Sequence, residues 1–135
     1  MELNAVEGKP IYVQIAEWLE EEILRGHIKE HEKIYSQYQL AEMFNINPAT
    51  AAKGINILAD QGILYKKRGL GMFLSPEAKE KIRDKRKNHT LKKLVEEVVF
   101  EAQLLGVTEA ELISMIRDAG KEFDEHDEHE GIEGG

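Results

Sequence analysis

Few residues of this chain have the types and spacing that enzyme chemistry requires. The histidines, at positions 27, 31, 89, 126 and 129, fall in expected connectors or in the C-terminal tail, without a paired nucleophile or HExxH spacing. The sequence contains no cysteine, which excludes disulfides, thiolate zinc sites and cysteine nucleophiles. His126 and His129 lie among carboxylates, but a tail without ordered backbone cannot fix metal geometry. We therefore predict that the chain is not an enzyme and binds no metal or cofactor.

Basic and polar side chains between residues 36 and 71 point to a different chemistry. The run KKRGLG at 66–71 places Lys66, Lys67 and Arg68 beside Gly69, which permits a tight turn. Three adjacent cations can contact a phosphate backbone or enter a minor groove, and a loop kept only for solubility is the alternative. Because the GxxxxGK[ST] pattern is missing, we do not expect a nucleotide-binding loop.

These side chains are positioned by the stretch from 36 to 62, where two helical patterns meet at a tight corner. Ser36 can cap a helix over 37–44 by accepting from the N–H of Gln39, whose side chain can reach back. Asn45 readily adopts a left-handed turn, and Asn47 followed by Pro48 opens the next helix. That helix stops at Gly62. The order predicts a helix-turn-helix.

The helix over 48–61 has two distinct faces. Its inward face is apolar, and its outward face is small and polar: Ala51, Ile55, Leu58 and Ala59 point inward, and Ala49, Thr50, Lys53, Asn56 and Gln61 outward. A helix end without bulky or acidic residues can enter a major groove, although an ordinary solvent-exposed face remains the alternative. Short β-type runs at 63–65 and 72–74 flank the basic turn and predict a two-stranded wing.

An amphipathic helix is expected before this corner, from Pro10 to Gly26. Its predicted outer face is acidic and should point away from DNA; it carries Glu17, Glu20, Glu21 and Glu22. The segment 27–35 lacks a period and reads as a connector whose Ile28 and Ile34 enter the core.

Charge is segregated along the chain. The net charge is −8, but residues 1–75 hold 8 basic and 10 acidic side chains, 76–93 hold 8 and 3, and 94–135 hold 2 and 13. Salt screens charges beyond roughly 8 Å, so the acidic C-terminal third does not prevent a local basic surface from binding phosphates. The cations of 76–93 could extend that surface or form a solvated helix face.

The C-terminal part has a heptad-like apolar seam. Leu91, Val95, Val98, Ala102 and Leu105 are spaced 4, 3, 4 and 3 residues apart, and Leu94 adds to a second apolar side. We predict that this helix pairs with the same helix of a second chain, with packing onto its own N-terminal domain as the alternative. Thr108-x-x-Glu111 opens a short last helix. A kink at 88–90 and one continuous helix both remain open. Helices of this size leave little room for a metabolite pocket, so we expect no built-in effector site; regulation would come by other means or through a site at the dimer interface.

The motif order over residues 10–74 resembles the N-terminal winged helix-turn-helix domain of GntR-family bacterial transcription regulators. The supporting segments are PIYVQIAEWLEEEILRGHI, YSQYQLAEMF and QGILYKKRGLGMFL. The start NPAT at 47–50 and the short C-terminal part are more like the YtrA-type subfamily. The resemblance implies regulation of the protein's own operon.

The resemblance also implies roles for individual residues. Ser36 and Gln37 would hold backbone phosphates, the recognition helix would face the major groove, and the wing would contact DNA; the helix residues are Asn47, Thr50 and Lys53, and the wing residues Lys67, Arg68 and Gly69. Family members often carry an arginine where this chain has Tyr38, whose hydroxyl could donate to a phosphate or whose ring could pack. With few arginines, affinity for one half-site should be low.

We therefore predict a mainly α fold with a small β-hairpin: a winged helix-turn-helix domain over 1–75, an α-helical linker and dimerisation region over 76–119, and a disordered acidic tail over 120–135. The predicted function is a homodimeric repressor that binds an inverted-repeat operator in double-stranded DNA. The alternative is a winged-helix protein-interaction module without DNA binding. No secretory signal and no apolar run near about 18 residues is present, so we expect a cytoplasmic protein without membrane contact.

Overall fold

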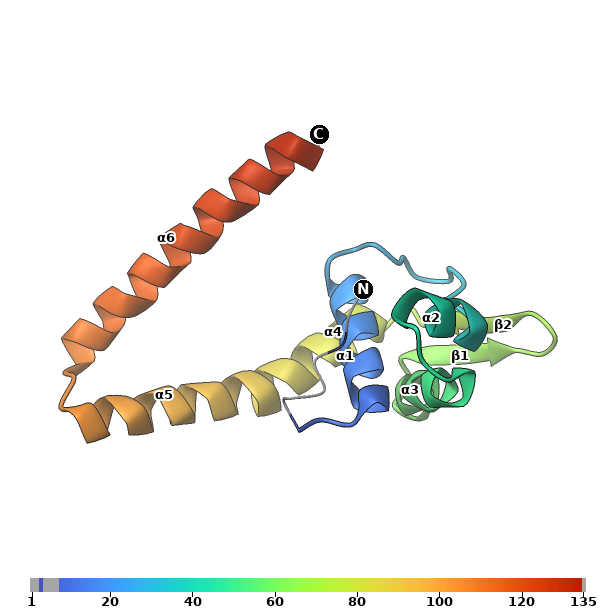
Figure 1. The fold of residues 1–135 in the computed structure, drawn as a ribbon, viewed down its shortest axis with the longest axis horizontal. Coiled ribbons are helices and arrows are strands. Elements are labelled where there is room, and N and C mark those ends of the chain that lie inside the picture. The colour runs from blue at the N-terminus through green and yellow to red at the C-terminus, as the bar shows by residue number, and fades with distance from the viewer. Residues whose placement is uncertain (1–2, 4–7, 135) are drawn as a thin grey trace. The chain divides into compact units, whose positions relative to one another are not determined.

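The computed structural model describes the backbone of residues 3 and 8–134 and the side chains of residues 3 and 8–125. Two units are distinguished, Met1–Asn88 and His89–Gly135. As Figure 1 shows, helices dominate and a single hairpin supplies the named strands of the described part, which confirms the predicted fold class. The elements are α1 (Ile11–Leu24), α2 (Gln37–Phe44), α3 (Pro48–Asp60), β1 (Leu64–Lys67), β2 (Gly71–Leu74), α4 (Ala78–Lys85), η2 (Arg86–Leu91), α5 (Lys92–Leu105) and α6 (Glu109–Gly134).

The core of the N-terminal unit forms where α1 packs against α3. Apolar residues every four positions give α1 one buried stripe, and Ile15, Leu19 and Leu58 are fully buried in the core. Gly54 makes the close crossing possible, because a Cβ there would lie 2.8 Å from the backbone oxygen of Tyr12. The contact therefore depends on a residue without a side chain.

The corner between α2 and α3 has the predicted geometry. Ser36 Oγ accepts from the N–H of Gln39 at 3.1 Å, and the Ser36 N–H donates to Gln39 Oε1 at 2.8 Å, so both halves of the capping box are present. Asn45 is left-handed, with φ 55°. Asn47 Oδ1 accepts from the N–H of Ala49 at 2.8 Å and caps α3. These local signals confirm the helix-turn-helix.

The wing is an antiparallel hairpin in which Leu64 pairs with Leu74 and Lys67 with Gly71. Its strands extend further toward the tip than predicted, so the turn is confined to residues 68–70. The segment before α2 also joins it: the His31 N–H donates to the Leu74 oxygen at 2.7 Å and the Ile34 N–H to the Met72 oxygen at 2.8 Å. The predicted connector is thus hydrogen-bonded along β2 as an irregular third segment beside the hairpin.

One prediction about α1 is wrong. Glu20 was placed on the acidic outer face, but its side chain is 3% exposed. It forms ion pairs with Lys85 and Arg86, and Arg86 also donates to the Glu17 backbone oxygen at 3.0 Å. The partners lie 65 and 66 residues away, so no local pattern revealed them.

Helix α4 belongs to the N-terminal unit, whereas the sequence placed the domain boundary after residue 75. Ile82 is fully buried and Ala78 is 1% exposed, and both belong to the core of that unit. A mostly polar helix is held by two small apolar contacts and by the ion pairs of Glu20. After α4, residues 86–91 form π-helical turns rather than a break.

In the C-terminal unit, α5 ends at Gly106, which is left-handed with φ 71°, and α6 follows. Thr108 Oγ1 accepts from the Glu111 N–H at 3.2 Å, as the capping motif predicts. The helical backbone of α6 continues to Gly134, whereas a disordered tail was predicted from 120. The residues after 120 include good helix formers and no proline, so nothing in them forces a stop. Within the described residues, no helix has the length and hydropathy to cross a membrane.

Candidate nucleic-acid interface

The start of α2 presents the first group of predicted contact residues. The Ser36 hydroxyl is already engaged as the helix cap, and Gln37 follows at the first helical position. Tyr38 is 69% exposed, so little of its ring is covered by the rest of the chain. Backbone N–H groups at a helix start carry partial positive charge and favour a phosphate.

The first turns of α3 present the second group. Asn47 uses its carbonyl oxygen for capping, which leaves the amide N–H donors of its side chain for other acceptors. Ala49 and Lys53 are exposed, and Thr50 is half-buried. The Lys53 ammonium lies 4.2 Å from the ring centroid of Tyr12, which holds this cation at the α1 side of the outward face.

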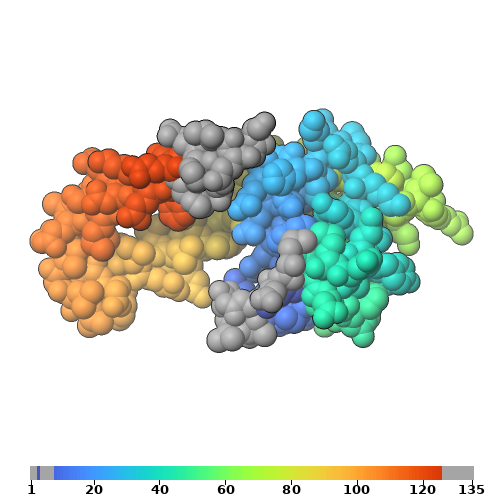
Figure 2. All heavy atoms as spheres, turned by 45° about the horizontal axis from the view of Figure 1, so that its top comes forward, coloured from blue at the N-terminus to red at the C-terminus, as the bar shows by residue number. Residues whose placement is uncertain are grey.

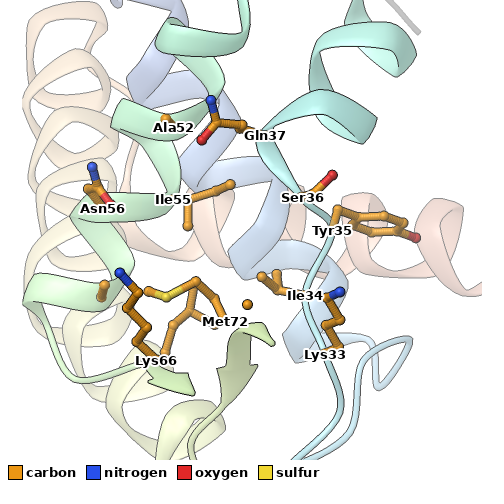
Figure 3. Close-up of a pocket in the computed structure, with 13 residues that line it drawn as sticks. Lys33, Ile34, Tyr35, Ser36, Gln37, Ala52, Ile55, Asn56, Lys66 and Met72 are labelled. Atoms are coloured by element: carbon orange, nitrogen blue, oxygen red, sulfur yellow. The ribbon is translucent and has the colours of Figure 1, made fainter. Parts of the chain in front are cut away.

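A groove of about 570 Å³ lies between the start of α2, α3 and the hairpin. It brings together the predicted Ser36, Gln37 and Lys66 with Asn56. Figure 3 shows Lys66 and Lys33 on opposite sides of this groove. Lys33 was missed in the sequence, because its place depends on the pairing of residues 31–34 with β2.

The two lysines of the wing face different ways. Side chains alternate along a strand, and Lys66 lines the groove while the Lys67 ammonium lies 4.6 Å from the Phe73 ring centroid. Tyr65 stacks on Phe73, with ring centroids 6.0 Å apart. The wing protrudes from the surface of the N-terminal unit in Figure 2, with Arg68 and Gly69 in the turn at its tip.

Two of the basic residues that follow the wing are engaged in contacts within the N-terminal unit. Lys85 and Arg86 are directed to Glu20, and Lys85 also donates to Gln61 Oε1 at 2.9 Å. Gln61, the last outward residue of the predicted recognition face, is thereby engaged at the far end of α3. The described residues hold no cluster of three metal-ligating side chains, and the side chains of His126 and His129 lie outside them.

The predicted dimer residues lie on α5, except Leu91, which is the last residue of η2. Five of the six are 44–68% exposed within the single chain: Leu91, Leu94, Val95, Val98 and Leu105. Ala102 is the exception at 7%, since it is covered near the turn into α6, where the Val107 N–H donates to its backbone oxygen at 2.8 Å. Met115 and Ile116 on α6 are each 59% exposed and add to the apolar surface of this unit.

Known proteins share this combination of elements. The family model described as bacterial regulatory proteins, gntR family, matches residues 11–74. The HTH-type transcriptional repressor YtrA of Bacillus subtilis (strain 168) is 28% identical over 118 residues, which is 87% of this chain and 90% of YtrA. The repressor NagR of the same organism is 33% identical over 75 residues, and the match spans only 31% of NagR.

A solved structure agrees over almost its whole length. The GntR family transcriptional regulator from Listeria monocytogenes superposes with a TM-score of 0.70 and 30% identity, covering 82% of this chain and 95% of that one. A match over 82% of this chain extends beyond the winged helix-turn-helix into the C-terminal unit.

Proposed function

Because the chain belongs to the GntR family of bacterial regulatory proteins, we propose that it is a homodimeric transcriptional repressor that binds an inverted-repeat DNA operator. Helix α3 enters the major groove, and the hairpin contacts the backbone or the adjacent minor groove. The C-terminal units of two chains pair. A two-fold dimer presents two copies of α3, so its operator has two-fold symmetry.

The main support for DNA binding is the groove beside α3 and the positive charge of its lining residues. None of the described residues lining it is acidic, whereas Lys33 and Lys66 lie at its sides. The Ser36 capping box fixes the start of α2 and the Asn47 side-chain cap fixes the start of α3, so their N–H groups are presented by rigid elements. A cationic concave surface next to an exposed, small-residue helix start fits a duplex with its phosphates.

The readout is proposed to depend on few side chains. Asn47 offers amide donors, Lys53 an ammonium and Asn56 an exposed amide on the same helix. Each good bidentate base contact contributes roughly 1–3 kcal/mol of discrimination, and α3 carries no arginine to make one with guanine. One corner alone therefore binds weakly, and pairing two corners raises the overall affinity by linking two binding events.

The dimer proposal rests on the apolar face of α5. Soluble monomers rarely expose contiguous apolar patches of large size, and such patches mark interaction sites. Residues at heptad spacing favour a parallel or antiparallel helix pair with the same helix of another copy. YtrA, whose length the chain nearly spans, carries the name repressor, which supports repression as the direction of control.

The test is a gel shift with DNA from upstream of the protein's own gene, titrated with salt and followed by a footprint. We expect saturable binding, a log K that falls by about 0.9 per phosphate contact for each unit of log salt, and two protected half-sites related by symmetry. A shuffled duplex of equal length is the control. Absence of any shift at low salt would contradict the proposal and favour a protein-interaction module.

A further inference from the structure

The groove beside α3 has a floor that DNA contact does not explain. Buried apolar side chains form its base, with Ile55 at 6% and Leu64 at 3% exposure, and Ala52 and Met72 complete it. Figure 3 shows Met72 in the space between the two lysines, with Ile55 above it on α3. A phosphate backbone is hydrated and charged, so it gains nothing from an apolar base.

The sides of the groove carry charge of one sign. Lys33 comes from the segment paired with β2 and Lys66 from β1, so two separate segments place an ammonium group on either side. Within the described part of the chain, neither lysine belongs to an ion pair. Gln37 and Asn56 add amide groups along the same opening. Unpaired cations above an apolar base match a molecule with an anionic group on an apolar body.

The size of the groove also fits such a molecule. Its volume of about 570 Å³ lies within the range of roughly 300–1,000 Å³ that small-molecule sites occupy. We propose that this groove binds a small amphipathic organic anion, such as an aromatic carboxylate, and that its binding competes directly with DNA. The inference rests on the proposed function, because Lys66 and Gln37 are among the residues assigned to phosphate contacts.

Competition follows from shared groups. An anion held between Lys33 and Lys66 neutralises cations that would otherwise replace counterions on the phosphates, so operator affinity falls. By linkage, operator DNA weakens binding of the anion by the same factor. No local sequence pattern predicted an effector site here, because the groove forms only when residues 33–37, α3 and the hairpin come together.

The test uses naphthalene-2-sulfonate as the probe and methyl NMR of the 135-residue chain as the readout. We expect saturable shifts at the methyl groups of Ile55, Ile34 and Met72. The neutral analogue naphthalene-2-sulfonamide and inorganic phosphate should each bind at least about tenfold more weakly, since each lacks one half of the match. Equal binding of either compound, or shifts confined to residues of α5 and α6, would overturn the proposal.

Two kinds of variant separate charge from shape. Lys33→Gln with Lys66→Gln should weaken sulfonate binding by at least about tenfold, whereas Lys79→Gln, an exposed lysine of α4 outside the groove, should leave it unchanged. Ala52→Leu fills the base while keeping both cations, and should also weaken it. Unchanged binding in both groove variants contradicts the site.

The competition is measured separately from the site. Sulfonate should displace the upstream DNA in the gel shift, and saturating DNA should suppress the methyl shifts. If DNA binds but sulfonate does not, the ligand site fails and the DNA-binding proposal stands. If sulfonate binds as predicted but no DNA shift is seen at low salt, the DNA-binding proposal and the competition fail, while the anion site remains.

Discussion

The N-terminal unit buries most of its large apolar side chains, whereas the C-terminal unit leaves many of its own exposed. In the N-terminal unit, residues such as Ile15, Leu40 and Ile63 are 0–2% exposed and form one core. In the C-terminal unit, Val98, Phe100 and Leu104 are 44%, 67% and 70% exposed. The first unit satisfies its own hydrophobic pattern, whereas the second presents a pattern that only another surface can bury.

This difference suits two separate roles in the proposed mechanism: contact with DNA and pairing of two chains. A self-contained winged helix-turn-helix can hold its contact residues rigidly whether or not a partner is present. An unburied helical seam stabilises nothing by itself, so its apolar residues contribute free energy only on assembly. We infer that the N-terminal unit makes the DNA contacts and that the C-terminal unit pairs two chains. Variants in one unit should therefore leave the role of the other unchanged.

Val98→Asp on α5 should weaken function more than any other single substitution proposed for this chain. A charge in the middle of the seam should dissociate the dimer and weaken operator binding by about 100-fold or more, because the second half-site then loses its linkage to the first. Light scattering and gel shifts measure the two consequences. Gln103→Asp adds the same charge to an exposed position outside the seam and should change neither. Dissociation by both variants would show that charge alone, and not the seam, is responsible.

The next effect should be confined to the N-terminal unit. Gly54→Ala forces a methyl group against the Tyr12 backbone oxygen and the Ile15 side chain, and should lower the free energy of unfolding by about 1–3 kcal/mol. Urea denaturation measures it. Gly120→Ala in α6 is the matched control, since a Cβ there meets nothing within 4 Å. An equal loss in both variants would contradict the role of the helix crossing.

A smaller effect should distinguish base readout from general affinity. Lys53→Ala or Thr50→Ala should weaken the operator by about fivefold, corresponding to roughly one hydrogen bond, and change random DNA less. Competition gel shifts with both duplexes give the ratio. An identical loss on both DNAs would assign these side chains to the backbone instead.

A still smaller effect should distinguish the two wing lysines, whose side chains point to opposite faces of β1. Lys66→Ala should reduce the slope of log K against log salt by about 0.9, the value for one phosphate contact. Lys67→Ala should change it less, because the Lys67 ammonium lies over the Phe73 ring. A larger change for Lys67 than for Lys66 would mean that this ring contact is released on DNA.

The sequence predicted correctly those features that depend on contacts between residues close together in the chain. The Ser36 capping box, the left-handed Asn45 and the Asn47-Pro48 start depend on neighbours within three residues, and all are present. Glu20 and Lys33 were misjudged or missed because their surroundings come from α4 and β2, far along the chain. The exposed seam was predicted from its period, but periodicity could not reveal that Ala102 is covered by its own chain.

We propose that the C-terminal unit pairs two copies of the N-terminal unit. Light scattering of the 135-residue chain at micromolar concentration tests it most directly. We expect a mass of twice the 15.4 kDa of one chain, without DNA. A mass of 15.4 kDa across that range would contradict it.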